Sequence, residues 1–345
     1  MTWYVIETLS PDAATVCFAG DKAVEWQSVS RLGGKLGVDL DSVVATVRAS
    51  GEREDSESEV RGTATRIIAE PALGPDGVVQ AVSVWVGAAG DEPTTAPKLG
   101  PLYVDLAEYK LVQTLECFML SANSPADFSA DRDPTLFLRK VIRFDKIPEF
   151  LQMAANPTEG SKFSCFMNIH HEAGHLMYWL GLARYDHDGK KIRALGQDIT
   201  EFSAPEVHPA ALASVDDGSL SRKSGALLIG FPGDQTQEPV LNYWMTPPPV
   251  RLRLNSAEKA GHHLHPDDVA AVWDVQRRLV DAEKTTQLSV FVRIAAGDDD
   301  DWVPTQTTFS SYPSETVGPA VLVARVRVLE DSEVAAMNAE AVLSP

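Results

Sequence analysis

The residues His171-Glu172-Ala173-Gly174-His175 form the string in this chain that most directly suggests catalysis. On a helix, two histidines four positions apart lie on one face and can share a Zn²⁺ ion, while the glutamate polarises a bound water. A zinc-dependent hydrolase would use His171, Glu172 and His175 in these roles. Because the motif is short, its structural context decides whether the chemistry follows.

The segments on both sides of this string favour a hairpin. Residues 163–169 and 176–185 have the composition of strands, and Gly174 weakens a helix between them. At a turn between two strands the imidazoles need not converge on one ion. We therefore expect no metal site, no catalytic residue and no evident cofactor, and treat the protein as a non-enzyme. The zinc-dependent hydrolase remains an alternative.

Four aromatic side chains are candidates for lining a ligand pocket: Tyr178, Trp179, Trp244 and Trp302. Their large apolar surfaces and polar tips suit ligand contacts. The same spacings are also typical of a hydrophobic core, so the aromatic residues alone do not define a site.

The composition is that of a globular protein with an acidic surface. The chain has 345 residues, 44% of them hydrophobic, and a formal net charge of −19. At roughly 100–200 residues per domain, this length predicts two or three domains. The negative charge repels phosphate backbones and anionic lipids, so nucleic acid is not expected as a partner.

Cysteine usage and hydropathy indicate a cytoplasmic protein. Cys17, Cys117 and Cys165 are far apart, odd in number and outside any C-x-x-C motif, which suits a reducing compartment. The first residues lack the basic and apolar regions of a signal peptide. No apolar run approaches the ~18 residues that a membrane span requires.

The pattern of strands, helices and turns predicts three domains in a row, at residues 1–89, 102–202 and 222–335. Residues 90–101 have the composition of a linker. The first domain contains a predicted helix that begins near Asp39 and ends at Ser50. The second and third share an order of strands, a helix and a three-stranded meander. The predicted fold class is α+β, with three modules that each place helices on one face of an antiparallel sheet.

Two segments carry a resemblance to a known family. Residues 185–200 pair an Asp-x-x-Gly turn with a strand ending in Gly-x-Asp-Ile-Thr, which resembles the last hairpin of a PAS domain. Residues 265–268, His-Pro-Asp-Asp, resemble the element that opens a helix in many PAS domains. Proline at the first helical position and two acids in the first turn favour a helix start there. Residues 1–89 look like the GAF-like domain that precedes PAS domains in actinobacterial proteins.

The chain is thus similar to mycobacterial tandem sensor-domain proteins with stacked GAF-like and PAS-like domains. The resemblance implies a non-catalytic sensor in signal transduction that binds a small ligand or a signalling protein and responds by inter-domain rearrangement. The resemblance is also compatible with a homodimer. A structural scaffold for protein–protein interaction is the second alternative to this sensor.

Overall fold

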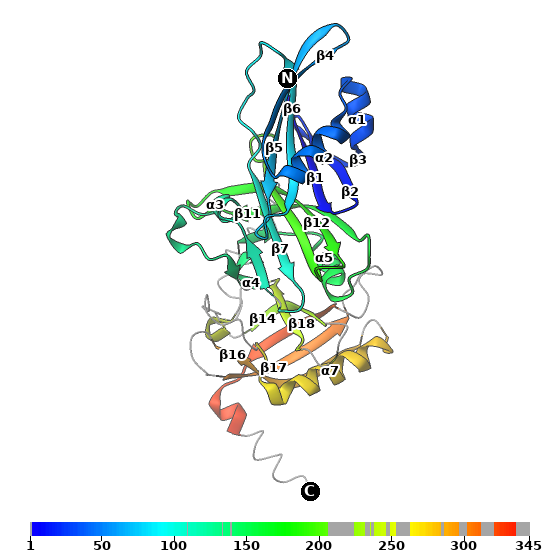
Figure 1. Ribbon diagram of the computed structural model, residues 1–345. Helices are drawn as coiled ribbons and strands as arrows, with labels where there is room; N and C mark the ends of the chain where they lie inside the picture. The colour runs from blue at the N-terminus through cyan, green and yellow to red at the C-terminus, as the bar shows by residue number, and fades with distance from the viewer. Residues whose placement is uncertain are drawn as a thin grey trace. The chain divides into compact units, whose positions relative to one another are not determined.

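The computed structural model describes residues 2–108, 110–132, 134–138, 140–205, 224–231, 235, 238–245, 249–252, 263–283, 286–296, 302–311 and 321–335 (Figure 1). Residues 222 and 223 and several further segments of the third predicted domain range lie outside the described residues. The chain forms two compact units. Unit 1 comprises Met1–Arg132, Lys140–Asp145 and Thr158–Glu206, and unit 2 comprises Asp133–Arg139, Lys146–Pro157 and Val207–Pro345.

Six strands of the described chain form the first sheet, in unit 1, with the order β3-β2-β1-β6-β5-β4. All of its neighbouring strands are antiparallel. The strands are β1 (Thr2–Ser10), β2 (Ala13–Ala19), β3 (Lys22–Ser28), β4 (Glu54–Val60), β5 (Thr63–Leu73) and β6 (Val79–Ala88).

Two capped helices cover one face of the first sheet, as Figure 1 shows. The helix α1 (Val29–Leu36) begins at the N-cap Ser28, and α2 (Leu40–Ser50) begins at the N-cap Asp39. Each helix ends at a glycine with positive φ, a conformation that favours glycine. The predicted helix ending at Ser50 is confirmed, and its buried side chains Leu40, Val43, Val44 and Val47 pack on the sheet.

Seven strands among the described residues form the second sheet, also in unit 1, with the order β10-β11-β12-β13-β7-β8-β9. A five-residue helix, α3 (Leu115–Met119), packs beside β7. A short 3₁₀ helix, η1 (Pro125–Asp127), follows it. The strands are β7 (Leu99–Asp105), β8 (Lys110–Gln113), β9 (Asp131–Arg132), β10 (Val141–Arg143), β11 (Lys162–His170), β12 (Leu176–Asp186) and β13 (Lys191–Asp198).

The first and second sheets pack face to face within unit 1. Side chains alternate between the two faces of a strand, so Tyr178, Leu180 and Leu182 of β12 point to the same side. They meet the other face of the first sheet, opposite α1 and α2. The buried side chains of this shared cluster are Val5, Leu9, Cys17, Phe18, Ala81, Leu99, Tyr178, Leu180, Leu182, Leu195 and Ile199.

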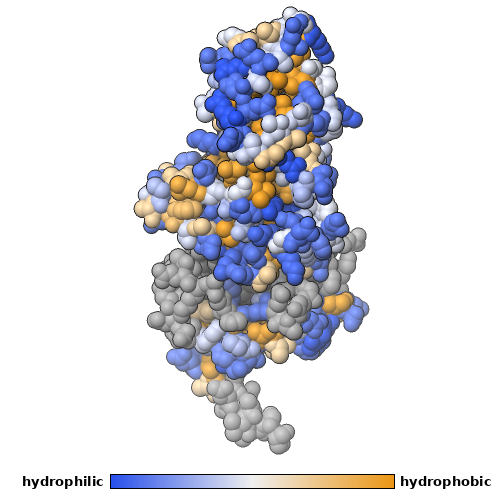
Figure 2. Space-filling view, in the orientation of Figure 1, coloured by the Kyte–Doolittle hydropathy of each residue, from blue (hydrophilic) through white to orange (hydrophobic). Residues whose placement is uncertain are grey.

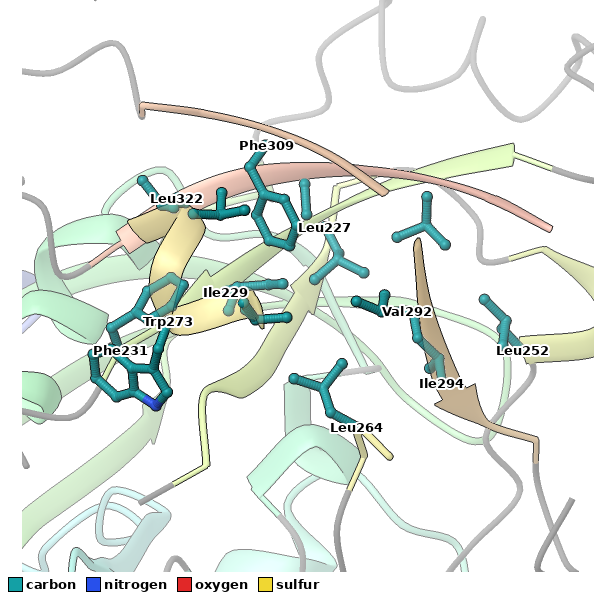
Figure 3. Close-up of a cluster of buried hydrophobic side chains, with 14 of the residues drawn as sticks. Leu227, Ile229, Phe231, Leu252, Leu264, Trp273, Val292, Ile294, Phe309 and Leu322 are labelled. Carbon is teal, nitrogen blue, oxygen red and sulfur yellow. The ribbon is translucent and has the colours of Figure 1, made fainter. Parts of the chain in front are cut away.

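Unit 2 is built around a third antiparallel sheet, whose described strands have the order β15-β14-β18-β17-β16. They are β14 (Ser224–Gly230), β15 (Val240–Trp244), β16 (Gln287–Ala295), β17 (Trp302–Ser311) and β18 (Val321–Val328). The helix α7 (Pro266–Val280) packs its Trp273 against Phe231 in the core drawn in Figure 3. A short 3₁₀ helix, η2 (Val250–Leu252), contributes the buried Leu252.

Two helices that lie within the second predicted domain range, 102–202, belong to unit 2. The helix α4 (Pro134–Leu138) contacts β15, and α5 (Ile147–Ala155) contacts β14 and β18. Each predicted domain range holds all or most of one described sheet, yet the compact units number two. The domain boundaries therefore stay a prediction.

The predicted fold class is wrong. Antiparallel strands dominate the described residues, helices are few, and they do not form a layer on one face of every sheet. The second sheet is covered by the first sheet on one face, where the sequence analysis expects helices. An alternating strand shows that one face is buried, but a second sheet can bury that face as well as a helix can. In addition, residues 99–101 begin β7 and are not part of a linker.

Most of the coloured residues on the face drawn in Figure 2 are hydrophilic. On the face drawn in Figure 2, hydrophobic residues emerge as separate patches between hydrophilic ones. Within the described part of the chain, no helix combines the length and the apolar character that crossing a bilayer would demand.

Candidate functional site

The predicted hairpin around the histidine motif is confirmed. The strand β11 pairs with β12 along its whole length, and residues 171–175 form the turn that joins them. The backbone N–H of His171 donates to the carbonyl of His175 at 2.9 Å. Gly174 has a φ of 90°, which suits glycine in a tight turn. The motif is therefore not carried by a helix.

The two imidazoles of this turn stack on each other. The ring centroids of His171 and His175 are 4.4 Å apart, with the planes 19° from parallel. The Nδ1 atom of His171 accepts a hydrogen bond from the backbone N–H of Ala173 at 3.0 Å. Burial and the neighbouring His175 lower the pKa of His171, which favours the neutral ring. One nitrogen of the first imidazole is thus engaged inside the turn.

The carboxylate of Glu172 anchors the turn to the rest of unit 1. It lies 2.8 Å from the Nζ atom of Lys140 and accepts a hydrogen bond from the backbone N–H of Asn123 at 2.9 Å. The hydrogen bond from Lys140 is the main reason that the pKa of Glu172 is lowered. No group of three or more His, Cys, Asp or Glu side chains in the described residues is arranged to hold a metal ion. The turn lacks the helical geometry that the hydrolase alternative requires.

The four aromatic pocket candidates do not share one site. Tyr178 faces the first sheet and stacks on Phe166 with centroids 5.3 Å apart. Its neighbour Trp179 belongs to the opposite face of β12, because successive residues of a strand alternate. Its ring packs closely on Gly196, where a Cβ atom would lie 3.1 Å from two carbons of the indole.

The other two candidates lie in unit 2. Trp244 packs against the core of the third sheet, and Trp302 makes an edge contact with His265 at 4.9 Å between centroids. None of the four aromatic residues lines the cleft described next. Their role in ligand binding stays a prediction.

A cleft of about 520 Å³ opens where the first and second sheets meet. It lies between β5 and β6 of the first sheet, the connecting residues 96–98, the start of β7, and α3. This volume is within the range of small-molecule sites. Its lining residues are Glu70, Pro71, Ala72, Leu73, Ser83, Ala96, Pro97, Lys98, Leu99, Pro101, Glu116, Met119 and Leu120.

Most of the cleft lining is apolar, with three charged side chains added. Glu116 is exposed in the first turn of α3, and no described residue forms an ion pair with it. Lys98 is also exposed and has no ion-pair partner among the described residues. Glu70 lies 3.7 Å from the Nε atom of Arg53, an exposed contact that contributes little. Two carboxylates and one ammonium group are therefore available to a ligand.

Ion pairs cross the contact between the first and second sheets. Arg184 of β12 binds Glu7 of β1, which is fully buried. Arg193 of β13 lies 2.9 Å from Asp76, which belongs to the turn between β5 and β6. Burial raises the pKa of Asp76, but the hydrogen bond and charge of Arg193 outweigh it, so the pKa is lowered. The Arg184–Glu7 pair is buried and therefore costs much to break, whereas Asp76 is partly exposed, so its pair contributes less.

Two buried glutamines near this contact have amides with no hydrogen-bond partner among the described residues. They are Gln80 on β6 and Gln197 on β13, with exposed fractions of 0% and 1%. The backbone of Gln197 pairs with that of Leu99, which lines the cleft. Buried amides without partners lower the stability of the native state.

The cleft residues follow no motif that sequence reasoning could detect. They come from two sheets, a connecting segment and a five-residue helix, and residues 70 and 116 are far apart in the chain. The acid after the N-cap Thr114 is a common helix signal and does not point to a ligand. Only the packing of the sheets brings these groups together.

The geometry defines a protein with two stacked antiparallel sheets and a cleft at their junction. Comparison with known protein families identifies one of these sheets. Residues 2–95 match the family model described as Rv3651-like, N-terminal. This match names that family and not a GAF domain. It covers the first sheet and its helices and ends before β7. No curated protein matches the sequence.

Among solved structures, the chain is similar to an uncharacterised protein from Mycobacterium tuberculosis. The TM-score is 0.72 at 21% sequence identity, and the match covers 97% of this chain and 98% of that chain. This likeness shows a shared fold. An RNA-binding light-oxygen-voltage receptor matches with a TM-score of 0.26 and 10% identity, over 72% of this chain and 100% of that chain. A TM-score this low does not show a shared fold.

Proposed function

We propose that this chain is a non-catalytic sensor that binds a small ligand in the cleft between its first two sheets. The observation that carries the proposal is the cleft itself, a space of about 520 Å³ with apolar walls and a few charged groups. Sites of this size and lining are typical of small-molecule binding.

The position of the cleft supports a role in signalling. Its walls come from both sheets and from residues 96–98, which lead from one sheet to the other. A ligand that fits one spacing of the walls better than another shifts the packing of the two sheets by its differential affinity. The turn geometry of His171, Glu172 and His175 supports a non-catalytic role, and the binding chemistry needs no cofactor.

A thermal-shift screen with a metabolite library tests this function. A ligand that binds the native state must raise Tm. The variant Ala72→Phe fills the cleft and should abolish the shift, whereas Ala13→Phe, on β2 outside the cleft, should retain it. Circular dichroism and unfolding curves verify that both variants fold. Ligands that stabilise the wild type and Ala72→Phe equally would contradict the cleft as their site.

A further inference from the structure

We infer that the cleft takes a zwitterionic ligand with an apolar body, of the chemical class of an apolar amino acid. This inference rests on the proposed function and specifies its ligand. It follows from the charged groups that line the cleft and from the apolar surface between them.

The apolar lining sets the body of the ligand. Leu99 and Leu120 are buried, and Met119 and Ala72 are partly buried, so they offer a hydrophobic wall at the junction. Removing apolar ligand surface from water against such a wall favours binding. A fully charged, hydrophilic ligand would leave this wall unused.

The charged lining sets the ends of the ligand. Glu116 has no ion-pair partner among the described residues, and an ammonium group would supply one. Glu70 adds a second carboxylate to the lining, and its contact with Arg53 is long, at 3.7 Å. Lys98, also without an ion-pair partner in the described part of the chain, would pair with a ligand carboxylate. Charge-assisted hydrogen bonds of this kind are stronger than neutral ones.

Ligands with a single charge match the three charged side chains of the cleft less well. An amine without a carboxylate would meet Glu116 but would be repelled by Lys98. An acid without an amine would meet Lys98 but face the carboxylates of Glu70 and Glu116. A zwitterion gives each sign of charge a partner, so it is the ligand class that the charge pattern favours.

Four probes that share a phenyl ring separate these cases: phenylalanine, phenethylamine, 3-phenylpropionate and 3-phenylpropanol. Binding is followed by NMR titration of the full chain, with chemical-shift changes monitored at the cleft residues. We expect phenylalanine to bind about tenfold more tightly than each of the other three. Equal or tighter binding of the amine, the acid or the alcohol overturns the inference.

Charge-removing variants assign the two ends. Glu116→Gln should weaken phenylalanine and phenethylamine about fivefold without weakening 3-phenylpropionate. Lys98→Met should weaken phenylalanine and 3-phenylpropionate without weakening phenethylamine. Glu25→Gln, an exposed acid on β3 outside the cleft, is the matched control and should change none of them. Uniform effects of Glu116→Gln on all four probes overturn the assignment.

The outcomes also separate this inference from the proposed function. If none of the four probes perturbs cleft residues, the zwitterion inference fails. If, at the same time, an uncharged library ligand raises Tm and Ala72→Phe abolishes that shift, the proposed function stands with a different ligand class. If the library also gives no shift that depends on the cleft, both fail.

Discussion

The carboxylate of Glu7 and the guanidinium of Arg184 form a buried pair that joins the first and second sheets. The Nη2 atom of Arg184 donates to Oε1 at 2.8 Å and Nε donates to Oε2 at 3.1 Å, although the residues are 177 positions apart. The backbone N–H of Leu9 and the hydroxyl of Thr15 also donate to this carboxylate. The ring of Trp26 covers the guanidinium at 4.7 Å.

Removal of Arg184 should destabilise the protein strongly. The change Arg184→Met leaves the Glu7 carboxylate, which is fully buried, without its cationic partner. Such a loss costs about 3–5 kcal/mol of unfolding free energy. Urea unfolding of Arg184→Met, Glu7→Gln and the double variant gives the coupling energy. A cost below about 1 kcal/mol for Arg184→Met would show that this pair does not hold the sheets together.

Replacement of the buried Gln197 should stabilise the protein. Neither amide atom of Gln197 has a hydrogen-bond partner among the described residues, so Gln197→Leu removes a desolvation cost of about 1–3 kcal/mol. Gln113→Leu is the matched control, because the Nε2 atom of Gln113 donates to the carbonyl of Ser129 at 3.1 Å. The control should be destabilised in the same urea experiment. Equal losses in both variants would mean that the Gln197 amide is satisfied.

Stability in unit 2 should depend on the ionisation of Asp268. Its carboxylate accepts hydrogen bonds at 2.8 and 2.9 Å from the backbone N–H and Nε atom of Arg293, which tie α7 to β16. Burial raises the pKa of Asp268, but these bonds outweigh it and hold the pKa below its ordinary value. The stabilisation is therefore present above the ordinary aspartate pKa of about 3.9 and is lost as pH falls through the lower folded-state pKa.

The variant Asp268→Asn measures this contribution. It should lower unfolding free energy by about 1–3 kcal/mol at pH 7, with the difference from the wild type shrinking on acidification below about pH 4. Asp274→Asn removes an exposed carboxylate of the same helix and should change stability little at any pH. A difference for Asp268→Asn that is the same at pH 7 and pH 3 would refute the role of ionisation.

The buried cysteines should be unreactive in the native protein. Burial raises the pKa of Cys117 to about 12, and burial with the nearby Glu7 raises that of Cys17. Since the thiolate is the reactive form, a disulfide reagent at pH 8 should modify neither residue until the chain unfolds. The variant Ser58→Cys, exposed on β4, supplies a reactive thiol for comparison. Modification of Cys117 as fast as of the introduced thiol in that variant would disprove its burial.

Local signals correctly predicted the ends of α2, the start of α7 and the central hairpin. The helix from Leu40 to Ser50 has the N-cap Asp39 and ends at Gly51, and α7 begins at the N-cap His265 and Pro266. These caps act within one turn, so neighbouring residues suffice to specify them. The same holds for the strand and turn character around residues 171–175, which the glycine at position 174 helps to set.

The tertiary structure alone decided what covers each sheet and where the cleft lies. Alternating residues such as Leu180 and Leu182 show that one face of β12 is buried, but the pattern is the same whether a helix or another sheet covers it. The partner of Arg184 and the meeting of Glu70 with Glu116 around one cleft depend on contacts between segments far apart in the chain. The sequence by itself therefore determined the short-range elements, whereas long-range packing determined the fold class and the candidate site.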